Sequence, residues 1–205
     1  MSKILRSLDV FPTFLHASYV STYSVLPPNL IATNNSSPAI FWSGLILPYM
    51  EYADLWNAID GTGNLLTISW TSSINLPLLQ RKIPVFQCPS APERNSTFTD
   101  AGIANRPRGN YGACVSGAIG PNSTTYGSDT WQQHFDDWGS TDGRYDGAIP
   151  CREIQNRSNS FSLSDIRDGT SKTIFAGERC RNPNNGRTYY SYIAVNNPAD
   201  NYARF

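Results

Sequence analysis

The sequence predicts an α+β fold, because helical periodicity is concentrated near the N-terminus and only short strand-like pieces follow it. Apolar residues recur at steps of four and three within residues 4–25 and again within residues 45–59, which places them on one face of a helix. From residue 65 onward the apolar pieces are short and lie between long polar connections. Helices followed by a run of strands favour an antiparallel sheet over the parallel sheet of alternating strands and helices.

The first helical segment is predicted to form an N-terminal arm. Its apolar face consists of Ile4, Leu8, Phe11, Leu15 and Tyr19. Pro12 kinks or restarts this helix, and the proline pair at residues 27 and 28 ends it. We therefore expect a helical arm over residues 1–28 and a globular domain over residues 29–205.

The second helical segment has the most regular spacing in the chain. Its apolar residues are Leu45, Tyr49, Tyr52, Trp56 and Ile59. Pro48 lies near the start of the regular part, where a missing N–H costs little, and Gly61 and Gly63 follow it as a stop signal. This spacing predicts one helix over residues 45–59.

Strands are predicted where short apolar or aromatic runs lie between turn-forming residues. These runs are residues 66–70, 83–86, 111–119, 172–176 and 189–195. Residues 29–38, 90–110 and 120–147 are polar and are predicted to be loops, and the pair Asp168-Gly169 marks a turn before the fourth strand. The expected sheet is therefore small, with long connections.

Charge and apolar patterning argue against nucleic-acid binding and against a membrane span. The chain has 16 Lys plus Arg and 16 Asp plus Glu, so it lacks the basic excess that displaces counterions from nucleic-acid phosphates. No run approaches the roughly 18 apolar residues of a membrane span, so none is predicted. Uncharged polar residues are abundant instead, with 23 Ser, 15 Thr and 18 Asn, which favours a location outside the cell.

The cysteines allow two interpretations. There are four, widely spaced along the chain: Cys88, Cys114, Cys151 and Cys180. No Cys-x-x-Cys pair occurs and only two histidines are present, so a zinc site is not expected. Two disulfides would indicate an oxidising compartment. The alternative is four reduced, buried cysteines that pack as small apolar side chains.

Residues 120–147 contain the best candidates for a ligand site. Four aspartates can supply oxygen ligands to calcium in a glycine-permitted loop: Asp136, Asp137, Asp142 and Asp146. Three aromatic side chains in the same loop can stack on sugar rings: Trp131, Trp138 and Tyr145. The aspartate spacing does not match an EF-hand, Asp-Gly pairs also form ordinary turns, and most aromatic residues belong to a core. The loop therefore supports an alternative function, a carbohydrate-binding module with or without calcium.

The sequence supports a catalytic site less than it supports a ligand site in residues 120–147. No Gly-x-Ser-x-Gly sequence marks a hydrolase nucleophile, and no glycine-rich loop opens a helix to bind nucleotide phosphates. His134 lies close to Asp136 and Asp137 in sequence, which would suit a hydrolase only if a serine joined them in a pocket. A histidine in a surface loop is the ordinary alternative, so we expect the protein not to be an enzyme.

Four segments of the chain together resemble one protein family. In order they are residues 47–57 (Leu-Pro-Tyr-Met-Glu, then Leu-Trp-Asn), 84–90 (Pro-Val-Phe-Gln-Cys-Pro-Ser), 110–114 (Asn-Tyr-Gly-Ala-Cys) and 166–178 (Ile-Arg-Asp-Gly-Thr-Ser-Lys-Thr-Ile, then Gly-Glu). We call them the first to fourth segments. They resemble the large bacterial family called domain of unknown function 1559, which is abundant in planctomycetes and whose members look like type IV pilins and type II secretion pseudopilins.

The resemblance implies a pilin-like domain, in which N-terminal helices pack on an antiparallel sheet with long loops. It implies no catalytic residues, and its implied partners are copies of this chain or related pilin-like subunits. The favoured function is therefore a non-enzymatic subunit of the cell surface or extracellular space that acts through protein–protein assembly. Family members usually begin with a leader and a long apolar helix and end with a region that carries a histidine. This sequence shows neither, so we expect a fragment, a specialised soluble relative or a subunit assembled by other contacts.

Alongside this resemblance we predict that Cys88 pairs with Cys114 and that Cys151 pairs with Cys180. Each bond would close a loop of about thirty residues or fewer, which the chain-entropy model rates at about 3.5 kcal/mol. Mass spectrometry of a non-reduced digest tests the pairing. A link between Cys88 and Cys151 would overturn it, and free thiols would remove the argument for an oxidising compartment.

Overall fold

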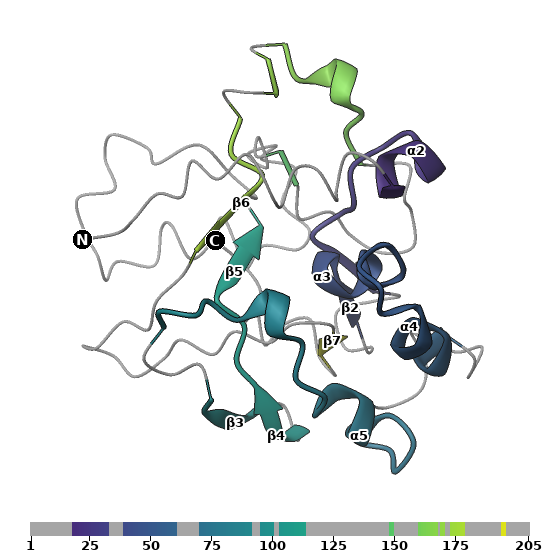
Figure 1. Cartoon of the computed structure of the whole chain (residues 1–205). Coiled ribbons are helices and arrows are strands. Elements are labelled where there is room, and N and C mark those ends of the chain that lie inside the picture. Colours follow the sequence, from purple (N-terminus) through teal and green to yellow (C-terminus); the bar gives the residue numbers. More distant parts are fainter. Residues whose placement is uncertain are drawn as a thin grey trace, which may run out of the picture.

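Short helices and three small antiparallel sheets make up the described part of the chain, so the predicted α+β class is confirmed. The computed structural model describes residues 18–32, 39–60, 70–91, 95–100, 103–113, 148–149, 160–167, 169–170, 173–178 and 194–195. In chain order the elements, with η for 3-10 helices, are α2 (Val20–Tyr23), β1 (Leu30–Ala32), β2 (Ala39–Phe41), α3 (Trp42–Leu45), η2 (Leu47–Tyr49), α4 (Ala53–Asp60), α5 (Leu76–Leu79), η3 (Pro84–Phe86), β3 (Thr97–Asp100), β4 (Ile103–Pro107), β5 (Tyr111–Ala113), η5 (Leu163–Asp165), β6 (Ala176–Glu178) and β7 (Ala194–Val195). The helices α2, α3 and α4 lie along one flank, on the right of Figure 1.

The first sheet is built on β2, which lies between β1 and β7 and runs antiparallel to both. All three residues of β2 are buried, as expected for a central strand of an apolar sequence. β7 lies inside the strand predicted over residues 189–195, whereas β1 lies inside the stretch predicted to be a loop. At the end of β2 the Trp42 N–H donates to the Asn29 carbonyl oxygen at 2.8 Å, which leads the chain directly into α3.

The prediction of one helix for the second helical segment is wrong, because the chain divides it into α3, η2 and α4. The last break is at Glu51, whose φ of 64° lies in the left-handed region. The Tyr52 N–H donates to the Leu47 carbonyl oxygen at 3.2 Å across that residue, which is the closure of a Schellman motif at a helix end. The apolar spacing still marks the inner face of α4, where Leu55 and Ile59 are buried.

The strand predicted over residues 83–86 is also wrong, since Pro84–Phe86 form the 3-10 helix η3. The Phe86 N–H donates to the Ile83 carbonyl oxygen at 3.0 Å, and the Gln87 N–H donates to the Pro84 carbonyl oxygen at 3.0 Å. Proline fixes φ near a helical value and has no N–H to lose in the first turn. These effects favour a turn over a strand at this position.

A β-hairpin lies within residues 90–110, which were predicted to be a loop. β3 pairs antiparallel with β4, and the register shifts between Phe98 and Asp100. Asn105 within β4 has a φ of 55°, a local irregularity of the kind that accompanies a bulge. Such short, bulged and polar strands do not show the alternation by which strands are recognised in a sequence.

The third sheet pairs β5 with β6 and confirms part of the strand predicted over residues 111–119. The strand predicted over residues 172–176 is wrong at its described residues 173–175, because β6 starts only at Ala176 and runs to Glu178. Gly169 has a φ of 91°, so the expected turn uses the glycine in a conformation that other residues adopt at a cost. The Thr173 hydroxyl donates to the Gly169 carbonyl oxygen at 3.1 Å, and this bond connects the turn to the residues that follow it.

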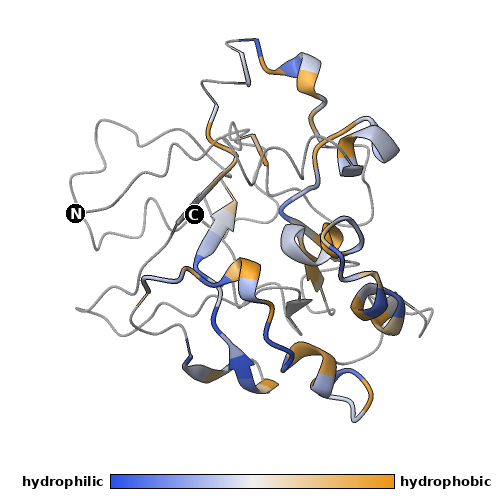
Figure 2. Ribbon diagram, in the orientation of Figure 1, coloured by the Kyte–Doolittle hydropathy of each residue, from blue (hydrophilic) through white to orange (hydrophobic). Residues whose placement is uncertain are grey.

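One hydrophobic core joins these elements. Its largest apolar side chains include Tyr19, Leu26, Trp42, Trp70 and Phe86. Figure 2 shows hydrophobic and hydrophilic residues on different sides of α4, and a largely hydrophilic β3–β4 hairpin. The Leu26 N–H donates to the Phe161 carbonyl oxygen at 2.7 Å, which connects the segment after α2 to the C-terminal half. Residues 1–17 of the predicted arm lie outside the described residues, so the boundary at residue 28 stays a prediction.

Within the described ranges, no helix combines the length and the apolar character that crossing a membrane requires.

Glu51→Gly is expected to raise the free energy of unfolding by about 1 kcal/mol, because a residue with a Cβ pays roughly that much in the left-handed region. Thermal unfolding followed by circular dichroism measures the change. Glu51→Ala is the matched control, since it removes the carboxylate but keeps the Cβ, and we expect no gain from it. An equal gain in both variants would assign the effect to charge and contradict the backbone argument.

The pKa of Asp165 is expected to lie below its ordinary value, because the Ser162 hydroxyl and then the Ser162 N–H donate to its Oδ2 at 2.8 and 2.7 Å. Because the pKa of Asp165 is lower in the folded state than in the unfolded state, its ionised carboxylate stabilises the fold at pH values above the unfolded-state pKa. This stabilisation is lost as the pH falls through the folded-state pKa. In an NMR titration, Ser162→Ala should raise the pKa of Asp165, whereas Ser164→Ala should leave both bonds in place. An unchanged pKa in Ser162→Ala would refute the capping interpretation.

Candidate functional site

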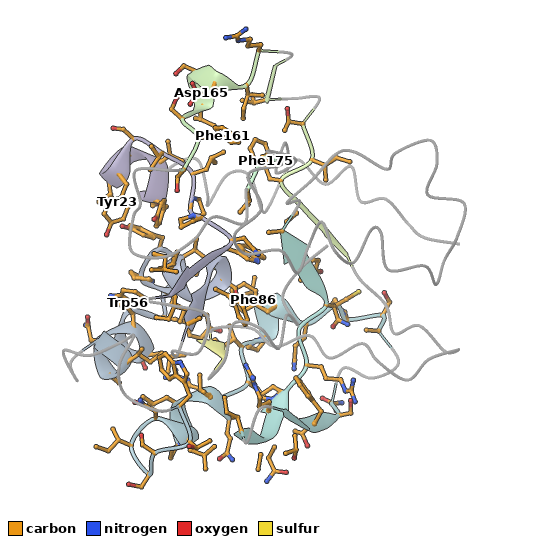
Figure 3. The ribbon with its side chains drawn as sticks, turned by 180° about the vertical axis from the view of Figure 1, so that it is seen from behind. Tyr23, Trp56, Phe86, Phe161, Asp165 and Phe175 are labelled. Atoms are coloured by element: carbon orange, nitrogen blue, oxygen red, sulfur yellow. The ribbon has the colours of Figure 1, made fainter. Side chains whose placement is uncertain are left out.

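The second, third and fourth segments meet in one place, which we call the motif junction (residues 86–88, 110–113 and 176–178). β5 carries the third segment and β6 the fourth, with Tyr111 opposite Glu178 and Gly112 opposite Gly177. Phe86 of the second segment lies near the centre of the molecule (Figure 3). The junction therefore brings together residues that are far apart in the sequence.

Asn110 holds the second segment against the start of β5. Its Oδ1 accepts the Cys88 N–H at 2.9 Å, and its own N–H donates to the Phe86 carbonyl oxygen at 2.8 Å. Asn110 and Cys88 are both buried, so water is a poor substitute for either partner. A buried N–H left without an acceptor costs about 1–3 kcal/mol, which makes the Asn110 carboxamide important for the junction.

Two glutamine side chains extend this attachment to the β4 segment. The Gln87 Nε2 donates to the Arg108 carbonyl oxygen at 3.2 Å, and the Gln80 Nε2 donates to the Ala104 carbonyl oxygen at 2.9 Å. Both bonds satisfy backbone carbonyls that would otherwise need water. Together with Asn110, they attach the chain between α5 and Cys88 to β4 and to the residues that follow it.

Cys88 is buried and forms no disulfide bond with any residue in the part of the chain that the structure describes. Its Sγ lies 3.0 Å from the Ser90 Oγ, and the Ala91 N–H donates to the Cys88 carbonyl oxygen at 3.1 Å in the turn that follows. The other three cysteines, Cys114, Cys151 and Cys180, lie outside the described residues. Both predicted disulfides therefore stay predictions.

The first segment reaches the motif junction through the core. Leu47 is fully buried, and Met50 and Leu55 belong to the same hydrophobic cluster as Phe86. The Trp42 ring, just before this segment, meets the Phe86 ring edge to face with centroids 6.1 Å apart. All four segments thus contribute to one packed interior.

A pair of arginines packs on the β3–β4 hairpin beside the junction. The guanidinium carbons of Arg106 and Arg108 lie 5.8 and 5.4 Å from the centroid of the Phe98 ring. Arg106 is buried, with 1% of its surface exposed. Stacking on an aromatic ring suits a guanidinium, which is planar and more weakly hydrated than an ammonium group.

A second charged contact lies on the helical flank. The Arg81 Nη1 donates to the Asp54 Oδ2 at 2.7 Å, and this bond holds the pKa of Asp54 below its ordinary value. The Arg81 guanidinium carbon also lies 5.7 Å from the centroid of the Tyr52 ring. Both charged side chains are exposed, so the pair contributes little to stability and remains accessible to a partner.

The ligand-site candidates from the 120–147 loop lie outside the described residues. These are the aspartates Asp136, Asp137, Asp142 and Asp146, the aromatic residues Trp131, Trp138 and Tyr145, and His134. In the ranges that the structure does describe, no three or more His, Cys, Asp or Glu side chains gather as metal ligands would. Calcium binding and sugar binding by this loop stay predictions.

Sequence reasoning gave no role to Asn110, Gln87 or Arg106. A signal was present for the first two, because an amide side chain stands next to aromatic residues that pack in the core. Buried amides in such positions usually have a specific hydrogen-bond partner. Arg106 gave no such signal, since the stretch around it was predicted to be a loop.

The fold and the junction define a small α+β protein in which all four segments contribute residues to the core. The family model described as "Protein of unknown function (DUF1559)" matches residues 16–195, which is most of the chain. The chain therefore belongs to this family. Neither the curated proteins nor the solved structures yield a significant match.

Asn110→Ala is expected to lower the free energy of unfolding by about 1–3 kcal/mol, because it leaves the buried Cys88 N–H without an acceptor. Chemical denaturation of the variant and the parent protein measures the loss. Asn57→Ala makes the same chemical change at an exposed position of α4 and should cost little. Equal effects at the two positions would contradict a specific role for Asn110.

Proposed function

We propose that this protein is a non-enzymatic structural subunit that resembles pilins and pseudopilins and acts through protein–protein assembly at the cell surface or outside the cell. The observation that carries the proposal is that side chains of the four segments lie in the interior and hold it together. Their described side chains support the interior, through Leu47 in the core and through the amide bonds of Gln87 and Asn110. A family recognised by such segments shares a scaffold, and a scaffold suits a protein that works through its shape.

The polar groups of the junction support this proposal in a second way. The Asn110 Oδ1 accepts one backbone N–H, and the Gln87 Nε2 donates to one backbone carbonyl oxygen. A side chain that is buried and committed to the backbone holds the fold and is poorly placed to turn over a substrate. These buried hydrogen bonds therefore favour a structural role for the segments over a catalytic one.

The pilin-like form is the finer part of the proposal. Pilin-like domains are expected to pack N-terminal helices on an antiparallel sheet, and here short helices line one flank beside small antiparallel sheets (Figure 1). The chain also has no net charge, so like copies do not repel one another at long range. A surface rich in Asn, Thr and Ser suits contacts in which water bridges polar groups.

Sedimentation velocity over a hundredfold range of protein concentration, with electron microscopy of the same samples, tests the proposal. We expect reversible growth of discrete oligomers as concentration rises. Recovery of the smaller species on dilution is the control that separates assembly from aggregation. A strictly monomeric protein over the whole range would contradict the proposal.

A further inference from the structure

An aromatic surface runs along the helical flank and gathers side chains from α2, η2 and α4. We call it the aromatic flank and define it by Tyr19, Tyr23, Tyr49, Tyr52 and Trp56. The Tyr19 ring centroid lies 4.6 Å from that of Tyr23 and 5.8 Å from that of Tyr49, which links α2 to η2. Tyr23 and Trp56 appear on the same side of the molecule in Figure 3.

Four of the five members of this flank are only partly covered. Tyr23 is 37% exposed, and Tyr49, Tyr52 and Trp56 are half-buried. Tyr19 is buried and packs against Tyr23 and Tyr49. Tyrosine and tryptophan are the residues that protein–protein contacts favour, because each offers a large apolar body and a polar tip at small entropic cost. The composition of the flank is therefore that of an interface centre.

Charged residues beside the flank form a pattern that complements itself. Glu51 and Asp54 lie at the start of α4, and Arg81 and Lys82 follow α5, all four of them exposed. Two acids and two bases sum to zero, so two copies of this surface do not repel each other. A two-fold axis that passes between the acidic and the basic residues places the acids of one copy opposite the bases of the other.

The arrangement of the rings separates this surface from a sugar site. Sugar stacking needs an open ring face, but the Arg81 guanidinium lies over the Tyr52 ring. Tyr19 packs against Tyr23 in a tilted geometry and against Tyr49 edge to face. Ring faces that are covered in this way are not open to stack on a sugar, which favours a protein partner.

We infer that the aromatic flank is a contact surface between two copies of this chain, related by a two-fold axis, across which Asp54 and Arg81 exchange partners. Within one copy these two side chains already pair at 2.7 Å, and both are exposed enough to turn to a second copy. The inference rests on the proposed function as an assembling subunit and names one of its contacts.

The first test compares two truncations by sedimentation equilibrium of the full chain. Tyr23→Ala should raise the dissociation constant at least about tenfold, as loss of an interface aromatic residue commonly does. Ile174→Ala is the matched control, because Ile174 is a large apolar residue with 57% exposure near β6, away from the flank. Equal association by Tyr23→Ala and the parent protein would overturn the inference.

The second test uses the two charges and does not depend on packing. Asp54→Arg and Arg81→Glu should each weaken self-association, because each places like charges opposite one another in the symmetric pair. An equimolar mixture of the two variants should associate about as well as the parent protein, since each then meets its complement. A mixture as weak as the separate variants would overturn the exchange of partners. A parent protein that never associates would overturn the proposed function as well, whereas association that ignores these variants would overturn only this contact.

Discussion

Two hydrogen bonds at Asn110 connect it to Cys88 and Phe86, which lie 22 and 24 positions earlier in the chain, and the interior depends on that connection. The Cys88 N–H is buried at the end of a 3-10 helix and needs an acceptor from elsewhere in the chain. The Asn110 carboxamide supplies it, and the same residue then leads into β5. Because β5 pairs with β6, this one residue fixes three of the four segments relative to one another. The first segment joins them through apolar packing around Phe86.

Local features interrupt two of the regular elements that the sequence predicts. Pro84 favours a 3-10 helix over the strand predicted at residues 83–86. The left-handed backbone of Glu51 separates η2 from α4, so no single long helix forms there. Each interruption turns the chain so that an apolar side chain can reach the common core. The fold gains its order from side-chain amides and from packing, and much less from long hydrogen-bonded ladders.

The sequence was informative where one physical signal dominated. Apolar spacing identified the inner face of α4, where Leu55 and Ile59 are buried. A run of small residues located β5, and an alternation of aromatic and small residues located β7. Conformations that oppose their neighbours were not foreseen, because Glu51 has no intrinsic preference for a positive φ and Asn105 interrupts β4. The hydrogen-bond partner of Asn110 was not foreseen for another reason: it is set by the three-dimensional fold and not by any local pattern. Sequence patterns could name the segments that matter but not the bonds between them.

Amide hydrogen exchange of the native protein tests the central claim most directly, because it reports the burial and bonding of individual N–H groups. The account predicts that the Cys88 and Asn110 amides exchange as slowly as the slowest amides of the core, and only through global unfolding. Exchange of these two amides within seconds, while core amides such as that of Ile40 stay protected, would show that the junction opens independently and would contradict the account.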